Sequence, residues 1–167
     1  IGSGCKVSSE ELEFERAEVS AAKNDHEGAL KHYKAVVDRF VKTPLAIKSA
    51  KEAARITHYQ LKRPKDAVEY YKHVVLNAPE AVDRLEVQKK LADIYFTETL
   101  EYGQAITEFS RLLELPRSQQ EDFAYRLAIA RSYFYLQNFF QSQVEVDTIL
   151  GRPYDKNMLF AAQLLKA

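Results

Sequence analysis

The 167-residue chain contains little cysteine, glycine or proline: it has one Cys, five Gly, five Pro and no Trp. A single cysteine cannot form an internal disulfide or supply a thiolate zinc site. With 46% hydrophobic and 11% aromatic residues, the chain is neither collagen-like nor disordered. No apolar run approaches the roughly 20 residues needed to cross a bilayer, so we predict no transmembrane segment. The composition indicates a globular chain with one sizeable core.

An excess of charge of one sign is also missing. The 24 Lys and Arg residues balance 24 Asp and Glu residues, which gives a formal net charge of zero. Binding to nucleic acid requires a surplus of cationic side chains that face the phosphates. We therefore expect no nucleic-acid partner.

Sequence motifs for chemistry are absent as well. The four histidines, His26, His32, His58 and His73, do not form a His-Glu-x-x-His pair. No glycine-rich stretch has the spacing of a phosphate-binding loop. We predict no metal site, no cofactor and no enzymatic activity.

A repeat of about 38 residues organises the chain. Each copy opens with a small residue, has a ring or branched side chain four positions later, and closes with an apolar pair. The opening residues are Ala29, Ala67, Ala105 and Ser142. A second small residue precedes each copy by about a dozen positions: Ala17, Ala54, Ala92 and Ala130. A proline follows each apolar pair: Pro44, Pro79, Pro116 and Pro153.

The repeat predicts pairs of antiparallel helices. Apolar residues recur at i+3 and i+4, which makes one buried stripe on a helix, and proline ends a helix or begins one. A single hairpin cannot bury its own apolar face, so the units are expected to stack on one another. We predict an all-α, right-handed α-solenoid over residues 10–154, with hairpins at about 10–44, 45–79, 80–116 and 117–153, followed by a terminal helix in 155–167.

This pattern resembles the tetratricopeptide repeat (TPR) family. The sequence departs from the family pattern in two ways. Ser20 and Thr57 stand where the first helix of a repeat usually has an aromatic residue, and the period of about 38 residues is longer than the common 34. Long units of this kind resemble the envelope branch of the family, which includes the β-barrel-assembly lipoprotein and the Tol–Pal-associated coordinator. The resemblance implies a protein–protein interaction scaffold in bacterial envelope assembly. The alternatives are a cytoplasmic adaptor for a signalling or motility partner, and a self-associating structural unit.

The two ends of the chain allow further predictions. Residues 1–9 are read as a flexible leader or as a lipobox remnant in which Cys5 carries a lipid. A lipidated Cys5 favours the periplasm or outer membrane, and its absence favours the cytoplasm. The apolar residues from Met158 to Leu165 predict either a terminal cap or the first helix of a truncated fifth repeat. Self-association through this helix is a further expectation.

The first helices of stacked hairpins line a concave side, and we predict a partner-binding groove there. Positions beside the buried small residues should face this groove. The candidate residues are Lys51, Arg55, His58, Tyr59, Lys89, Asp93, Phe96, Arg131, Phe134 and Tyr135. Four cations and several rings on one face predict an acidic protein or peptide partner with aromatic anchors. The alternative is a solvated face without a ligand.

Overall fold

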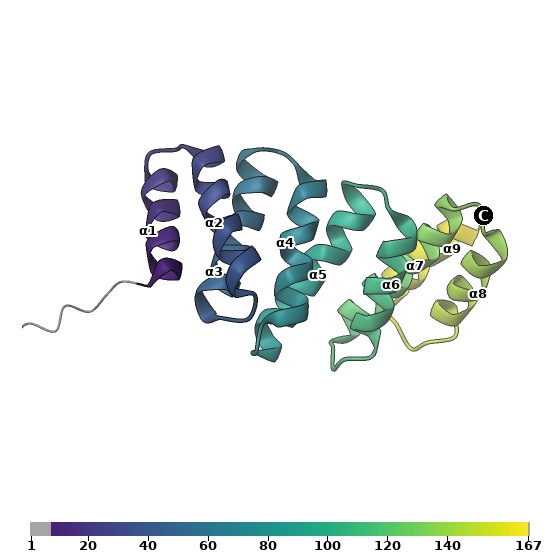
Figure 1. Cartoon of the computed structure of the whole chain (residues 1–167). Coiled ribbons are helices and arrows are strands. Elements are labelled where there is room, and N and C mark those ends of the chain that lie inside the picture. Colours follow the sequence, from purple (N-terminus) through teal and green to yellow (C-terminus); the bar gives the residue numbers. More distant parts are fainter. Residues whose placement is uncertain (1–7, 167) are drawn as a thin grey trace, which may run out of the picture. The chain divides into compact units, whose positions relative to one another are not determined.

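The computed structural model describes residues 8–166, which form α-helices joined by short links and contain no strand (Figure 1). The helices are α1 (Ser9–Ala22), α2 (His26–Phe40), α3 (Pro44–Arg55), α4 (Pro64–Asn77), α5 (Ala81–Thr97), α6 (Tyr102–Leu113), α7 (Gln119–Tyr135), α8 (Phe139–Leu150) and α9 (Lys156–Lys166). A π-helical turn, η1 (Ile56–Gln60), extends α3. The predicted all-α class is confirmed.

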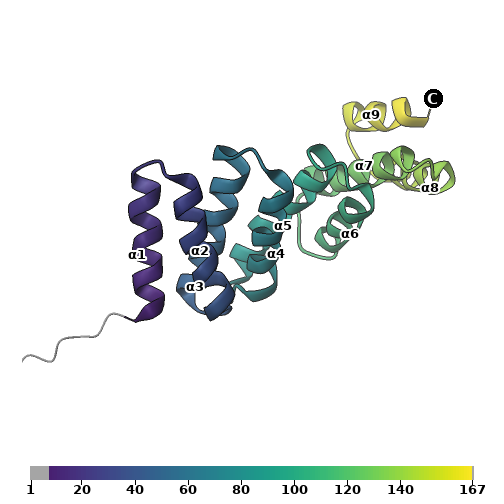
Figure 2. The same cartoon turned by 45° about the horizontal axis from the view of Figure 1, so that its top comes forward.

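Successive helices form hairpins. The first pair, α1 and α2, lies side by side and antiparallel in both views (Figures 1 and 2). The chain divides into two compact units, and the boundary falls within α5 after Val87. The first unit contains α1 to α4 with the start of α5, and the second contains the rest of α5 with α6 to α9.

The small residues of the repeat lie where helices meet. All seven of the repeat alanines are fully buried, and Ser142 is only 4% exposed. The side chains at the ring position are buried too: they are Tyr33, Tyr71, Phe109 and Val146. A small side chain lets two helices approach closely, and the larger one fills the space beside it. In the first unit, Ala17 and Ala29 pack with Tyr33 in one core cluster.

Prolines and caps determine where the first helix of each hairpin begins. Pro44 is the first residue of α3, and Pro79, Pro116 and Pro153 lie in the links that precede α5, α7 and α9. Proline suits these places because its missing amide hydrogen is not needed there. Capping boxes begin two of these helices, where Ser8 pairs with Glu11 and Ser118 pairs with Glu121.

Each hairpin turn contains one residue with a positive φ angle. These residues are Asn24, Lys62, Leu100 and Gln137, with φ between 56° and 59°. The next residue donates its backbone N–H back to the end of the preceding helix, as Glu101 does to Tyr95 at 2.9 Å. This left-handed residue ends the first helix and turns the chain into the second.

The terminal helix α9 packs on the second unit through one face. Ala162 is fully buried and lies in a core cluster with Leu127, Ile149 and Tyr154. The opposite face exposes Phe160 and Leu164. The predicted helix is therefore present, while its role in self-association stays a prediction.

Two further features of the described residues concern membrane-spanning helices and metal-binding side chains. In residues 8–166, no helix combines the length and the apolar character that crossing a membrane requires. Over the same residues, no group of His, Cys, Asp and Glu side chains is arranged to hold a metal ion. Cys5, the lipidation candidate, lies outside the described part of the chain.

Candidate partner-binding site

A hollow of about 290 Å³ lies in the second unit, beside α5 and α7. Its lining combines aromatic and aliphatic side chains with one carboxylate and one guanidinium. The lining residues are Asp93, Phe96, Phe109, Phe123, Ala124, Tyr125, Leu127, Ala128 and Arg131. Four of them, Asp93, Phe96, Leu127 and Arg131, lie where the repeat places the faces beside Ala92 and Ala130.

Helix geometry brings the lining residues together. Asp93 and Phe96 are three residues apart on α5, and Leu127 and Arg131 are four apart on α7, so each pair shares one helix face. Phe109, the repeat's ring residue on α6, packs beneath them and is buried. Its ring centroid lies 6.3 Å from that of Phe96 and 5.6 Å from that of Tyr125. The hollow therefore has an aromatic floor held by packing.

The two charged residues of the hollow carry opposite charges and line the same cavity. Among residues 8–166, neither Asp93 nor Arg131 forms an ion pair with another side chain. Burial raises the pKa of the Asp93 carboxyl, because desolvation disfavours its charged form. Asp93 as a whole residue is exposed, so its carboxylate is accessible to a cationic group of a ligand.

The other predicted cations are paired within the chain. Lys51 lies 2.7 Å from a carboxylate oxygen of Asp83, and Arg55 lies 2.9 Å from one of Glu52. Both pairs are in the first unit. These intramolecular carboxylates already neutralise the charges that were expected to attract an acidic partner.

Lys89 is paired as well, in the second unit. Its ammonium donates a hydrogen bond to Glu121 at 2.5 Å, which joins α5 to the start of α7. This hydrogen bond raises the pKa of Lys89 and, with help from Ser118, lowers the pKa of Glu121 to about 2. Lys89 therefore connects two helices instead of lining the hollow.

The remaining predicted residues lie outside the hollow. In the first unit, the rings of His58 and Tyr59 have centroids 4.3 Å apart, at the π-helical turn η1. In the second unit, Tyr135 stacks on Tyr102 with centroids 4.8 Å apart, and Phe134 lies edge-on to Phe139 at the α7–α8 turn. The structure therefore groups Asp93, Phe96 and Arg131 and distributes the other seven elsewhere.

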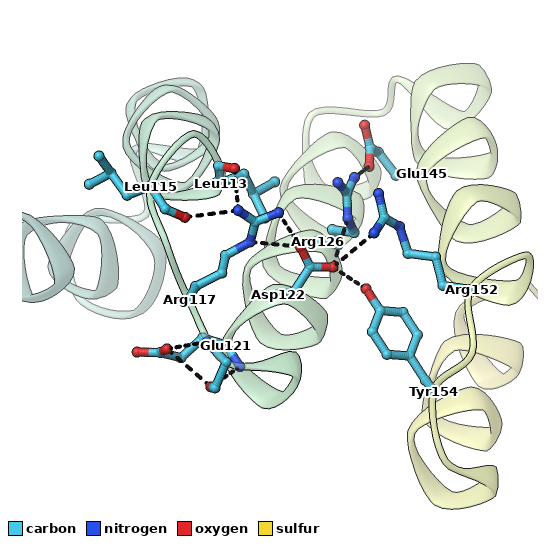
Figure 3. Close-up of polar contacts among 10 residues, drawn as sticks. Leu113, Leu115, Arg117, Glu121, Asp122, Arg126, Glu145, Arg152 and Tyr154 are labelled. Atoms are coloured by element: carbon cyan, nitrogen blue, oxygen red, sulfur yellow. Dashed lines mark hydrogen bonds and ion pairs between the residues drawn. The ribbon is translucent and has the colours of Figure 1, made fainter.

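A buried carboxylate holds α7, the helix that carries six of the nine lining residues. Asp122 on α7 is 7% exposed and accepts hydrogen bonds from the Arg117 guanidinium at 2.6 Å and the Arg126 guanidinium at 3.1 Å (Figure 3). Arg152, in the α8–α9 link, lies 3.5 Å away, and the Tyr154 hydroxyl also donates to Asp122. Burial alone would raise the pKa of Asp122, but the donors from Tyr154 and Arg117 outweigh it and lower that pKa.

This polar cluster ties three segments together. Arg117 also donates to the backbone carbonyls of Leu113 at 2.5 Å and Leu115 at 2.9 Å, which secures the α6–α7 link (Figure 3). Gln119 donates to the carbonyl of Pro153 at 2.7 Å. The start of α7 is thus held between the link before it and the link before α9.

The candidate residues predicted from the sequence omit six of the lining residues and the whole Asp122 cluster. The omitted lining residues are Phe109, Phe123, Ala124, Tyr125, Leu127 and Ala128, of which Leu127 lies on the helix face that the repeat assigns to the groove. Burial of Phe109 could be predicted, since the repeat assigns this residue to the ring position between the helices of a hairpin. The ring therefore lies at the bottom of the hollow. Asp122 had no comparable signal, because three of its partners, Arg117, Arg152 and Tyr154, come from links whose sequence does not repeat.

Comparison with solved structures identifies the fold. A tetratricopeptide repeat protein from Parabacteroides merdae is 20% identical with a TM-score of 0.56, and the match covers 94% of this chain and 58% of that one. A Podosopora anserina protein described as a kinesin light chain with nearly identical TPR-like repeats is 19% identical with a TM-score of 0.54, covering 96% and 80%. This chain therefore spans little more than half of the Parabacteroides merdae protein. No family model and no curated protein matches the sequence. The chain has a TPR-like fold, as its repeat predicts.

Proposed function

We propose that this TPR-like chain is a non-enzymatic interaction module that holds a segment of a protein partner in the hollow of its second unit. The fold itself is suited to protein–protein interaction. The observation that carries the proposal is the pair Asp93 and Arg131, two oppositely charged residues without ion-pair partners in the described chain, beside an aromatic floor. Both residues are exposed and neither charge is taken up by an ion pair, so both are accessible to a ligand.

The size of the hollow favours one anchoring side chain of a peptide. Pockets for small molecules are typically about 300–1,000 Å³, and this hollow of about 290 Å³ lies at the lower limit. A single aromatic or branched side chain buried on Phe109 would supply most of the apolar contact. Buried aromatic anchors of this kind dominate the energy of many interfaces.

The charges specify what should flank that anchor. A basic group on the partner complements Asp93, and an acidic group complements Arg131. This proposal keeps the aromatic anchor and the acidic group that the sequence predicts, and it adds a basic group opposite Asp93. Lys51, Arg55 and Lys89 already face carboxylates of their own chain, so an acidic partner would have to displace those pairs.

We also propose that the module works at the bacterial envelope, attached through a lipid on Cys5. The resemblance to long-repeat envelope lipoproteins and the Gly-Ser-Gly-Cys segment support this location. Metabolic labelling with a fatty-acid analogue should mark the wild-type protein and leave Cys5→Ser unmarked. If neither protein is labelled, the cytoplasmic adaptor becomes the better description.

The binding proposal can be tested with a displayed library of random peptides. Selected peptides should share an apolar anchor with a basic residue on one side and an acidic residue on the other. Fluorescence anisotropy should then give affinities about tenfold weaker for Arg131→Gln, and charge reversal at Arg131 should be rescued by a lysine in place of the peptide's acid. Arg39→Gln, at an exposed position of α2, is the matched control and should change nothing.

A blocking substitution checks the position of the site. Ala124 is an exposed alanine in the lining, so Ala124→Trp should fill the hollow without disturbing the core. Peptide binding should be lost, whereas Ala81→Trp, at an exposed alanine of α5 outside the lining, should retain it. Peptides that bind Ala124→Trp as tightly as the wild type would refute the hollow as the binding site.

A further inference from the structure

The turn between α7 and α8 carries exposed apolar side chains that the hollow does not use. Their exposed fractions run from 43% for Phe134 to 73% for Phe140. Together we name Phe134, Tyr135, Leu136, Phe139 and Phe140 the elbow patch. Phe134 and Phe139 contact each other edge-on, with ring centroids 5.5 Å apart, so they present one continuous surface across the turn.

The other three hairpin turns show what the fold itself requires at this place. Counting three residues beyond the positive-φ residue of each turn gives Glu27, Lys65, Gly103 and Phe140. All four positions are exposed, and in the first three hairpins they hold a charged residue or a glycine. Folding of the hairpin therefore does not need an apolar side chain there. The exposed phenylalanine of the fourth hairpin points to an interaction instead.

The elbow patch is also uncharged. Residues 132–144 include no Asp, Glu, Lys or Arg, although such residues make up 29% of the chain. The exposed polar side chains of this stretch include the amides Gln137 and Asn138. An amide offers both a donor and an acceptor, so it can hydrogen-bond to a second copy of itself, which two carboxylates or two ammonium groups cannot do.

We propose that two copies of this chain associate through the elbow patch about a two-fold axis that passes beside Phe140, its most exposed residue. A two-fold interface brings the same surface of each copy together, and residues beside the axis face their own copies, so a charge there would face its like. The elbow patch meets this condition, because it has rings for apolar contact and amides for pairing, and it brings no like charges together. An anionic membrane surface fits less well, since the stretch lacks the Lys and Arg that such surfaces attract.

This association is separate from the exposed face of α9. Phe160, which is 60% exposed on that helix, is not part of the elbow patch and provides an internal control. Tyr135 of the elbow patch contacts Phe96 of the hollow, with ring centroids 6.3 Å apart. Phe140 is not a lining residue, so substitutions there test association without altering the hollow.

Sedimentation of the full chain from micromolar to millimolar concentration tests the proposal. The wild type should form a dimer, and Phe140→Glu or Phe140→Lys alone should weaken association at least about 30-fold, the effect of losing one interface hot spot. Phe140 is exposed, so the helical circular dichroism of both variants should equal that of the wild type. An equimolar mixture of the two variants should recover the dimer, because the axis sets opposite charges near each other.

Two control variants test whether the dimer interface is specific to the elbow patch. Leu76→Glu, at a 79% exposed leucine of α4, and Phe160→Glu should leave the dimer intact. A wild type that is monomeric at millimolar concentration would overturn the proposal. So would loss of the dimer in Phe160→Glu, which would move the interface to α9, or a mixture of the two Phe140 variants that stays monomeric.

Discussion

Asp122 and Tyr154 are hydrogen-bonded across 32 residues of sequence, and this bond joins α7 to the link that leads into α9. The tyrosine hydroxyl donates to a carboxylate that also receives Arg117 and Arg126. Burial and the hydrogen bond to Asp122 raise the pKa of Tyr154 to about 12, so the hydroxyl keeps its proton and stays a donor at physiological pH. The link before α9 is therefore fixed by polar contacts as well as by apolar packing.

Removing the carboxylate should destabilise the second unit. Asp122→Ala leaves three guanidinium groups without their shared partner in a mostly buried place, at a cost of about 3 kcal/mol. Urea unfolding followed by circular dichroism measures this loss. Asp66→Ala, at an exposed aspartate of α4, is the comparison and should cost less than about 1 kcal/mol. Equal losses in the two variants would mean that the cluster does not hold α7 in place.

Acid should weaken the fold in a definite pH window. The folded-state pKa of Glu121 is about 2 against an ordinary value of 4.5, and that of Asp122 is also lowered. A carboxyl with a depressed pKa stabilises the fold fully above its unfolded pKa and loses this contribution as the pH falls through the folded value. The melting temperature should therefore fall from about pH 4.5 towards pH 2.

A variant separates the contribution of Glu121 from general acid effects. In Glu121→Gln the decline of melting temperature over that pH window should be shallower, because the side chain no longer takes up a proton. Glu114→Gln, at an exposed glutamate just after α6, should keep the steep wild-type decline. Identical pH profiles for the two variants would argue against the Lys89–Glu121 pair as the cause.

Glycine should stabilise one of the hairpin turns. Leu100 has a φ of 56°, which costs a residue with a side chain about 1–2 kcal/mol, and its side chain is exposed. Leu100→Gly removes this strain but adds freedom to the unfolded chain, so a net gain of about 0.5–1 kcal/mol is expected. The same substitution at Leu76, an exposed helical leucine with negative φ, should instead cost about 1 kcal/mol. Denaturation midpoints that shift in the same direction for both would contradict the turn geometry.

Overpacking should expose the role of the repeat alanines. Ala92 on α5 is fully buried, so Ala92→Leu must push the neighbouring helices apart and should cost about 1–3 kcal/mol. Ala81→Leu, at the exposed start of the same helix, should be within about 0.5 kcal/mol of the wild type. Thermal melts of the two variants give the comparison, and a stable Ala92→Leu would show that the helices do not meet closely at this residue.

Much of the fold could be predicted because its rules are local and repeat. A buried small residue at Ala54 or Ala105 follows from spacing along one helix, and so does the burial of Tyr33 or Phe109 four residues after a small residue. The position of Pro44 at the start of α3 follows from the chemistry of proline alone. These features need no knowledge of distant parts of the chain.

The candidate site was predicted only in part. The repeat register identified Asp93, Phe96 and Arg131, which line the hollow, since it assigns each residue to a helix face. It could not distinguish them from Lys51 and Lys89, whose positions follow the same rule. The difference lies in the carboxylates of Asp83 and Glu121, each 32 residues after its lysine. These two pairs occupy equivalent repeat positions, but spacing alone does not show that their side chains meet, because the contact depends on how one hairpin packs on the next.

The sequence by itself therefore determined the period, the helices and which small residues are buried, because these depend on side-chain spacing along one helix at a time. Tertiary structure alone decided which charges are paired, where the hollow lies and that Asp122 collects donors from two links. It also left Phe134 and Phe140 exposed at the α7–α8 turn. Those outcomes depend on contacts between different hairpins and links, which side-chain spacing along a single helix does not reveal.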